Sequence, residues 1–268
     1  MKKAIVFVLV LGVSQAALAD WDQTMPAKWV QAPDLSSTGL DVRCGKNPTD
    51  PYTKVLADDF LCTETGPITS IHIWGSWLND YLPFYADPTA VEFHLSLHED
   101  IPAEQSPTGY SMPAQPAIWE ADFMLTQFGV QVWAENLTEQ FYDPNWDEII
   151  GSDTVCYQYN FDLTQAGIPP LMQFGTPENP VVYWLDVKAE SFDPNAVFGW
   201  KTSLDHWNDD AVYWDEVFAP TPSELVYPVG HPMEGESIDL AFVIVPEPAT
   251  LSLLGLGALA LVRRRRTA

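Results

Sequence analysis

A short polar segment, residues 205–210, holds the densest group of side chains that could bind a ligand or a metal. Its members surround one tryptophan: Asp205, His206, Trp207, Asn208, Asp209 and Asp210. Carboxylate and amide oxygens are the ligands that Ca²⁺ takes, and an indole ring beside them could stack on the face of a sugar. Asn and Asp are also typical of loops whose side chains bond to their own backbone. We favour such a polar loop and keep the segment as the candidate ligand or Ca²⁺ site.

Two further groups of acids resemble known sites and then depart from them. The segment 143–147 begins like an EF-hand loop, but Glu148 stands where that loop needs glycine and Thr154 where it needs a bidentate acid. Asp58 and Asp59 are adjacent in an expected strand, so their side chains point to opposite faces and do not converge. No motif of a known catalytic class occurs. The sequence therefore assigns no catalytic residue.

The elements that must position these side chains are short strands. Apolar and polar residues alternate over 91–98 and 238–245, the pattern of a strand with one buried face. Further strands are expected at 55–62, 68–77, 117–123, 129–133, 155–161, 181–189, 198–203 and 225–227. Turns separate them, and Pro169 and Pro170 limit one helical turn near 164–172. We predict an all-β fold, a single jelly-roll-like β-sandwich of about ten short antiparallel strands with long loops.

The body of the chain is strongly acidic. Lys2, Lys3 and four C-terminal arginines lie outside residues 20–245, which leaves six basic and 36 acidic side chains there, a net charge of about −30. Such a surface repels nucleic acid, which excludes that partner, and it repels acidic polysaccharide unless a divalent cation bridges the two. All 11 tryptophans lie in the body, and an aromatic content this high indicates a packed fold.

Residues 1–19 have the layout of a secretory signal peptide. Two lysines precede an apolar run at 4–13, and the small residues Ala17 and Ala19 fit a signal peptidase site before Asp20. The apolar run is too short to span a bilayer core of about 30 Å. We therefore expect export through the Sec machinery and cleavage by signal peptidase.

Residues 246–268 form a second signal at the other end of the chain. Three short motifs follow one another: Pro246, Glu247 and Pro248, then a short apolar transmembrane segment at 249–262, then Arg263, Arg264, Arg265 and Arg266. Arginines after an apolar run act as a stop-transfer element, because positive charge stays on the cytoplasmic side. The apolar segment would be about 21 Å long as a helix, which is short for a permanent span.

The order of these three motifs resembles the PEP-CTERM sorting signal. The resemblance implies recognition by exosortase, a membrane protease and transpeptidase, with transient membrane insertion of the tail and cleavage near the Pro-Glu-Pro motif. It also implies a place at the cell surface, in the outer membrane or in the extracellular biofilm matrix of a Gram-negative-type bacterium. The body resembles an uncharacterised domain that recurs in exported proteins with such tails, on the segments 56–60, 71–77 and 199–210. That second resemblance implies no activity.

Export would bring the three cysteines into an oxidising compartment. Cys44 and Cys62 flank a polar, proline-containing segment, and a disulfide between them could close that loop. Cys156 lies in an apolar strand, where a buried free thiol is the expected state.

These observations predict a non-enzymatic β-sandwich displayed outside the cell, with extracellular polysaccharide as its candidate ligand. A row of exposed aromatic side chains would support this function, and five tryptophans are the first to examine: Trp74, Trp77, Trp200, Trp207 and Trp214. One alternative is a Ca²⁺-stabilised structural surface protein. A second is a secreted glycan-active hydrolase, which needs two facing carboxylates in a cleft.

Overall fold

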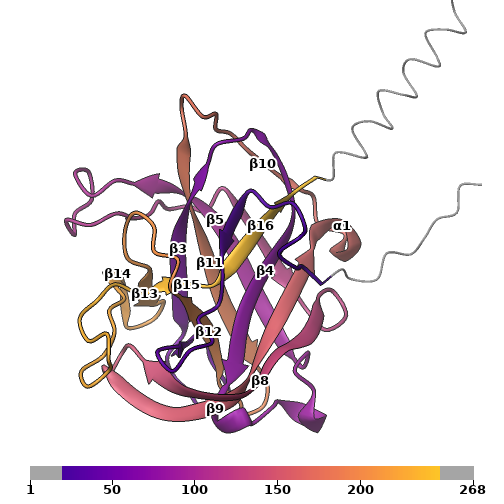
Figure 1. The fold of residues 1–268 in the computed structure, drawn as a ribbon, viewed down its shortest axis with the longest axis vertical. Coiled ribbons are helices and arrows are strands. Elements are labelled where there is room, and N and C mark those ends of the chain that lie inside the picture. The colour runs from indigo at the N-terminus through magenta and orange to yellow at the C-terminus, as the bar shows by residue number, and fades with distance from the viewer. Residues whose placement is uncertain (1–19, 248–268) are drawn as a thin grey trace, which may run out of the picture.

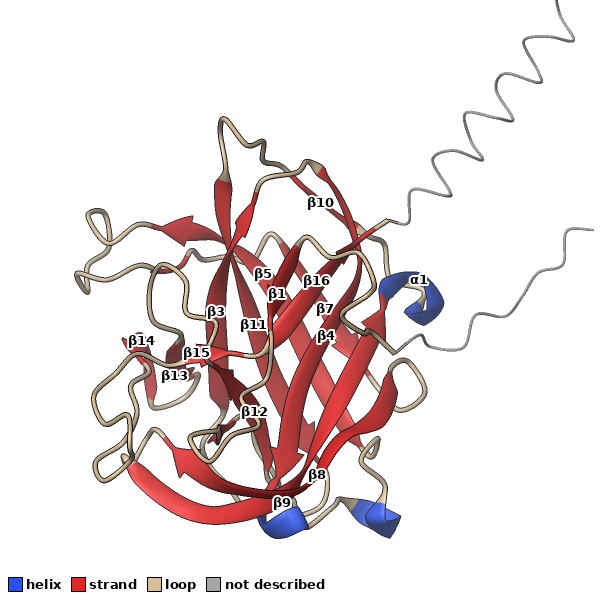
Figure 2. Ribbon diagram, viewed as in Figure 1, coloured by secondary structure: helices blue, strands red, loops and turns tan. Residues whose placement is uncertain are grey.

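The computed structural model describes residues 20–247 as two β-sheets with helical segments of only three or four residues (Figures 1 and 2). The helical segments are η1 (Leu78–Asp80), η2 (Phe84–Ala86) and α1 (Leu163–Ala166). One hydrophobic core draws its buried side chains from both sheets. The predicted all-β sandwich is confirmed.

The larger sheet has nine strands, in the order β1-β16-β4-β9-β8-β2-β12-β15, with β10 paired to β4. Their bounds are β1 (Trp29–Gln31), β2 (Leu40–Arg43), β4 (Gly66–Trp77), β8 (Gly129–Asp143), β9 (Glu148–Asp162), β10 (Leu171–Gln173), β12 (Phe198–Ser203), β15 (Asp239–Leu240) and β16 (Phe242–Pro246). The pairing of β2 with β8 is parallel, and the others are antiparallel.

The smaller sheet has seven strands, in the order β14-β13-β3-β11-β5-β6, with β7 paired to β5. Their bounds are β3 (Lys54–Cys62), β5 (Val91–Ile101), β6 (Met112–Pro113), β7 (Trp119–Phe123), β11 (Val181–Ser191), β13 (Val212–Asp215) and β14 (Ala219–Glu224). Leu56 and Phe60 of β3 belong to the main core, whereas Val55 and Ala57 join a second apolar cluster, as the period of two along a strand requires.

Five strands of the larger sheet close into a ring. β4, β9, β8, β2 and β12 pair in that order, and β12 returns to β4 by pairing Trp200 with Gly75. The two chains meet closely there, because a Cβ atom on Gly75 would lie 2.3 Å from the carbonyl oxygen of Gly199. A glycine at position 75 therefore permits the ring to close.

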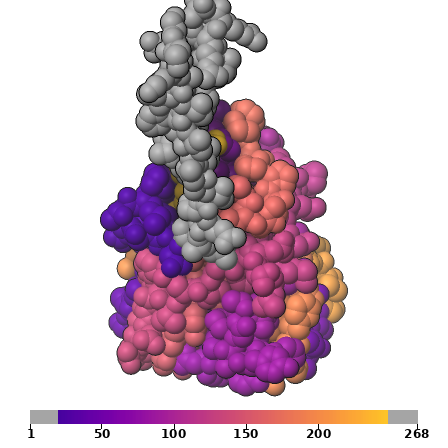
Figure 3. Space-filling view, turned by 90° about the vertical axis from the view of Figure 1, so that its right-hand side faces the viewer, coloured from indigo at the N-terminus to yellow at the C-terminus, as the bar shows by residue number. Residues whose placement is uncertain are grey.

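The β8–β9 hairpin is longer than its sequence pattern predicted. Each strand has 15 residues, although alternation indicated strands only at 129–133 and 155–161. The register shifts three times along the hairpin, which breaks the period of two that sequence analysis depends on. The hairpin forms much of the face seen in Figure 3, where it appears in pink.

The number of strands also differs from the prediction of about ten, since residues 20–247 form 16. The unpredicted strands β1, β2, β6, β10, β13 and β14 have two to six residues each, too few for a reliable alternation pattern. Residues 225–227 form no strand and make only one bridge, between Val226 and Ser237. The helical turn predicted near 164–172 is α1, which begins after Asp162 and ends at Ala166, with Gly167 as its C-cap.

The expected disulfide between Cys44 and Cys62 is wrong. Both are free, buried thiols, and so is Cys156. Gly45 bridges to Lys54, the first residue of β3, whereas Cys62 is the last residue of that strand. At ~3.3 Å per residue the two ends of β3 lie about 26 Å apart. A disulfide needs Cα atoms within roughly 7 Å, so the length of β3 keeps the two thiols apart.

The two sorting signals fall largely outside the described residues. These include the cleavage residues Ala17 and Ala19, the segment 249–262, Pro248 and the four arginines. Pro246 is the last residue of β16, and its carbonyl oxygen accepts a hydrogen bond from Thr69 Oγ1 at 3.0 Å. Within 20–247, no helix is long and apolar enough to cross a membrane.

Candidate functional site

The predicted loop, residues 205–210, is fastened to the sandwich by its polar side chains. Asp205 accepts from the backbone N–H of Ala32 (2.9 Å), His206 bonds to Asp239 (2.6 Å), Asn208 donates to Asp59 (2.6 Å), and Ser111 donates to Asp209. Burial raises the pKa of Asp59 to about 9 and that of Asp239 to about 8. The only three carboxylates within residues 20–247 whose oxygens converge to within 4.8 Å lie elsewhere in the fold.

The five tryptophans named for examination do not form the exposed row that would support polysaccharide binding. Trp74, Trp77, Trp200 and Trp214 are buried. Trp207 is half-buried, and its ring packs edge-on against Trp29 with centroids 5.2 Å apart. Tryptophans in strands that alternate toward a core fill that core, so their number in the sequence does not report exposure.

Three other aromatic side chains do gather at the surface. Tyr52, Trp146 and Phe218, which we call the aromatic pocket, come from three loops that are far apart in the sequence. The Tyr52 ring centroid lies 5.8 Å from that of Trp146 and 5.0 Å from that of Phe218. Trp146 is 58% exposed and Phe218 is 61% exposed. Exposed aromatic rings that cluster in this way mark a binding surface more often than isolated apolar residues do.

Two buried aspartates hold the loops that carry these rings. Asp143 ends β8, and its Oδ1 accepts the backbone N–H of Asn145 at 3.1 Å in the turn before Trp146. Asp215 ends β13, and its Oδ1 accepts the backbone N–H of Phe218 at 2.7 Å. The other oxygen of Asp215 accepts the backbone N–H of Thr53 at 2.9 Å, next to Tyr52. Residues 144–147 thus form a turn, in keeping with the departure of this segment from the EF-hand pattern.

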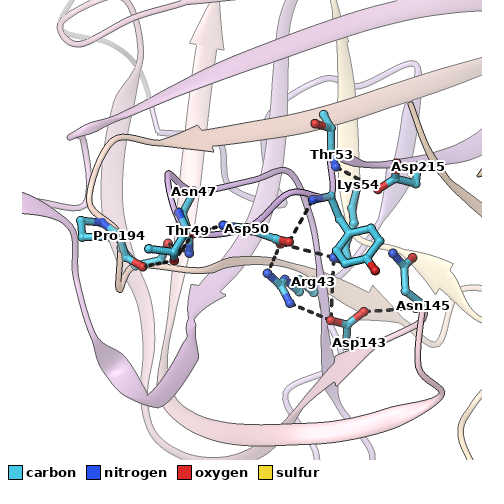
Figure 4. A network of polar contacts seen from close by, with 12 residues as sticks. Arg43, Asn47, Thr49, Asp50, Thr53, Lys54, Asp143, Asn145, Pro194 and Asp215 are labelled. Atoms are coloured by element: carbon cyan, nitrogen blue, oxygen red, sulfur yellow. Dashed lines mark hydrogen bonds and ion pairs between the residues drawn. The ribbon is translucent and has the colours of Figure 1, made fainter. Parts of the chain in front are cut away.

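A network of ion pairs beneath the pocket fixes these loops to one another (Figure 4). Arg43 donates to both Asp50 and Asp143, and its Nη1 lies 2.7 Å from Asp143 Oδ2. The buried Lys54 ammonium lies 3.4 Å from Asp50 and 3.8 Å from Asp143. It also lies 4.9 Å from the centroid of the Tyr52 ring, a cation–π contact. Burial, together with the charge of Arg43, lowers the pKa of Lys54.

The pocket has a volume of about 220 Å³ and a polar rim. The rim side chains of Asn145, Thr221 and Ser223 have no hydrogen-bond partner in the described part of the chain, so they are free to bond to a ligand. Pockets for drug-sized ligands usually measure about 300–1,000 Å³. The aromatic pocket is smaller and suits one flat ring with hydroxyl groups at its edge.

The arrangement is suited to binding rather than to acid–base chemistry. Apolar ring faces attract the C–H face of a sugar, and amide and hydroxyl groups bond to its hydroxyls. The one carboxylate that lines the pocket, Asp215, already accepts backbone hydrogen bonds at both oxygens. A glycoside hydrolase needs two available carboxyl groups about 5–10 Å apart, and this pocket does not offer them.

A second hollow, on the outer face of the smaller sheet, contains a serine, a histidine and an aspartate. His98 Nε2 contacts both Ser96 Oγ (3.0 Å) and Asp186 Oδ2 (2.9 Å), while Nδ1 bonds to the carbonyl oxygen of Ala114 (2.7 Å). A catalytic triad needs its serine and its aspartate on opposite nitrogens of the histidine. His98 therefore pairs with Asp186 and cannot relay a proton from Ser96 to that carboxylate.

Sequence analysis missed the aromatic pocket for a physical reason. Its three rings come from positions 52, 146 and 218, and only the pairing of β3, β13 and the β8–β9 turn brings them together. A local signal existed at Trp146, because a large apolar residue in an Asp-Pro-Asn turn is expected to be exposed.

Two family models match the chain. One is described as a domain of unknown function (DUF7901) and covers residues 27–245, and the other is the PEP-CTERM protein-sorting motif, which covers residues 245–266. No curated protein and no solved structure matches. Both resemblances noted in the sequence are therefore confirmed. The sorting motif identifies an exported protein of Gram-negative bacteria that exosortase processes and that reaches the cell surface or the extracellular space.

Proposed function

We propose that this chain, which belongs to the DUF7901 family and carries a PEP-CTERM sorting motif, is a non-enzymatic surface or matrix protein that binds a neutral polysaccharide in its aromatic pocket. The observation that carries the proposal is the exposure of Trp146 and Phe218 in loops that buried aspartates hold in place. Loops whose backbone is already held lose little conformational entropy on binding, which favours affinity.

The charges of the body favour a neutral ligand. Its cationic side chains all have acceptors inside the fold: Lys28 donates to the Gly66 carbonyl, and Arg43, Lys46, Lys54, Lys188 and Lys201 each pair with a carboxylate. No cation of the body is left to meet the carboxylates or sulfates of an acidic polysaccharide, which the net charge of about −30 also repels.

The location and the processing of the chain fit the same proposal. Export through the Sec machinery, cleavage after Ala19 and transient membrane insertion of the tail would place the body where extracellular polysaccharide is abundant. The Ca²⁺-stabilised alternative rests on the loop at 205–210, where Asp205, His206 and Asn208 already bond within the fold.

A glycan array tests the proposed ligand class. The exported protein is applied to neutral glucans, xylans and galactomannans and to acidic alginates, in Ca²⁺ and in EDTA. We expect retention on at least one neutral polymer, equal in the two buffers, because the pocket binds through apolar faces and neutral hydrogen bonds. Retention on acidic polymers alone, and only in Ca²⁺, would contradict binding of a neutral ligand. It would show instead that a bridging cation holds an acidic polysaccharide to the protein. No retention on any polymer would overturn polysaccharide binding.

A further inference from the structure

A buried polar cluster lies among the five strands that close into the ring. Its members are Asp41 of β2, Glu139 of β8, Asp153 of β9 and Lys201 of β12, each no more than 1% exposed. Lys201 and Asp41 are direct partners in the pairing of β12 with β2. Three acids and one amine thus share a space that water does not reach.

The amine is in contact with two of the acids. Lys201 Nζ lies 3.0 Å from Asp41 Oδ2 and 2.5 Å from Glu139 Oε2. Oxygens of Asp41, Glu139 and Asp153 lie within 4.8 Å of one another, and neither oxygen of Asp153 has a hydrogen-bond partner among the described residues. The ammonium therefore pairs with Asp41 and Glu139 and forms no ion pair with Asp153.

Burial makes two of the acids able to carry a proton at neutral pH. It raises the pKa of Glu139 to about 7 and, together with the charge of Asp41, that of Asp153 to about 9. Burial acts to lower the pKa of Lys201, but the charges of Asp41 and Glu139 outweigh it and raise that pKa. The resting state is therefore an ammonium paired with carboxylates, beside a neutral Asp153.

We propose that Lys201 and Asp41 condense to an intramolecular isopeptide bond that joins β12 to β2. The Nζ atom forms a bond to Asp41 Cγ, and the bond from Cγ to one carboxyl oxygen breaks. The ammonium and the carboxylate together become one amide and one water molecule, so atoms and charge balance without an oxidant or a co-reactant.

The neighbouring acids have the positions that the proton transfers need. Glu139, at 2.5 Å from Nζ, accepts a proton from the ammonium and leaves a nucleophilic amine. The neutral Asp153 lies beside Asp41 and donates one proton to the leaving oxygen. The second proton that the nitrogen loses as it becomes an amide passes to the same oxygen, which then leaves as water. Glu139 then returns its proton to Asp153, which restores both groups.

The geometry also favours the product. Two groups held in contact react as though at effective concentrations of about 10⁵–10⁸ M, and the amide replaces a buried pair of charges whose desolvation is unfavourable. The space is tight, because a Cβ atom on Gly39 would lie 2.9 Å from Glu139 Oε1 and 3.1 Å from Lys201 Nζ. The bond would close a loop across residues 41–201 and resist unfolding of an exported protein.

Peptide mass spectrometry of the exported protein tests this proposal. Trypsin should release the peptide 29–43 covalently joined to the peptide that contains Lys201, with a mass lower than their sum by one water. Trypsin should also fail to cleave after Lys201, because its amine is acylated. Separate peptides with no mass loss, in protein kept folded for days, would overturn the proposal.

Two variants test the roles of Glu139 and Lys201 in forming the isopeptide bond. Glu139→Gln keeps the shape of the side chain but cannot accept the proton, so it should fold, as shown by circular dichroism, and leave the two peptides unlinked. Lys201→Arg keeps the charge and removes the reactive amine, and should also give unlinked peptides. A linked peptide in Lys201→Arg would place the cross-link elsewhere and contradict the assignment.

Discussion

At the scale of single residues, several buried charged side chains in this fold are paired with side chains of opposite charge. Arg43 and Lys54 hold the loops of the aromatic pocket, Lys201 lies among three acids, and His98 lies against Asp186. A buried pair gives modest net stability, but removal of one partner leaves an uncompensated charge and costs about 3–5 kcal/mol. These side chains position loops and strands more than they add to the free energy of folding.

His98 should make the stability of the protein depend on pH. Burial acts to lower its pKa, but the hydrogen bond and the charge of Asp186 outweigh burial and raise it. The folded state therefore holds this proton more tightly than the unfolded state, whose histidine pKa is about 6.5. The stabilisation is complete below that pH and is lost as pH rises through the folded-state pKa, by at most about 1.4 kcal/mol per pH unit.

Urea denaturation between pH 6 and 9 measures this effect. His98→Gln should flatten the decline in the free energy of unfolding above neutral pH. His94→Gln is the matched control, since His94 lies on the same strand and is paired with the largely exposed Asp122. Equal pH profiles for wild type and His98→Gln would show that the pair does not titrate in this range.

Residue types alone predicted part of this picture. Asn and Asp in the segments 143–147 and 205–210 do form loops held by their side chains, as turn propensities indicate. The neighbours of Lys201 could not be predicted, because alternation in a six-residue strand does not show which face a lysine takes. The exposure of Trp146 and the burial of Trp74 depend in the same way on tertiary packing.

At the scale of elements, local sequence patterns located most of the longer strands. β3, β4, β5, β7, β11 and β12 lie within a few residues of their predicted bounds. The predicted strand at 238–245 divides into β15 and β16, because it changes partner from β12 to β4. Strand order, the parallel pairing of β2 with β8 and the closed ring come from long-range contacts, which no local pattern contains.

Gly45 lies where the chain passes from the larger sheet to the smaller, and its replacement should disrupt that crossing. Its φ is +81°, and a Cβ atom there would lie 1.6 Å from the carbonyl oxygen of Ala189 in β11. Gly45→Ala should lower the free energy of unfolding by more than about 4 kcal/mol or prevent folding. Gly109→Ala is the matched control, since Gly109 has a φ of +91° and no atom within 4 Å.

Thermal unfolding followed by circular dichroism compares the two glycine variants. Gly109→Ala should lower the free energy of unfolding only by the cost of holding alanine at a positive φ, about 1–2 kcal/mol. Similar melting temperatures for the two variants would mean that backbone conformation alone, and not contact with β11, decides the cost at position 45.

At the scale of the whole molecule, net charge and the sorting motif act together. From its net charge we expect the body to repel nucleic acid and acidic polymers, while the PEP-CTERM motif directs the exported protein to the cell surface or the extracellular space. The aromatic pocket then offers clustered, exposed aromatic rings at the surface. Our proposal of a neutral polysaccharide as the extracellular ligand rests on this combination of charge, location and pocket chemistry.

The affinity of two tryptophan variants for a neutral glycan tests the central claim most directly. Trp146→Ala removes an exposed ring of the aromatic pocket, and Trp207→Ala removes the half-buried ring of the loop at 205–210. Titration calorimetry of each exported variant with the polymer retained on the array should show at least a tenfold weaker Kd for Trp146→Ala, about 1.4 kcal/mol, and little change for Trp207→Ala. Unchanged binding in Trp146→Ala, with binding lost in Trp207→Ala, would contradict the aromatic pocket and move the site to the loop.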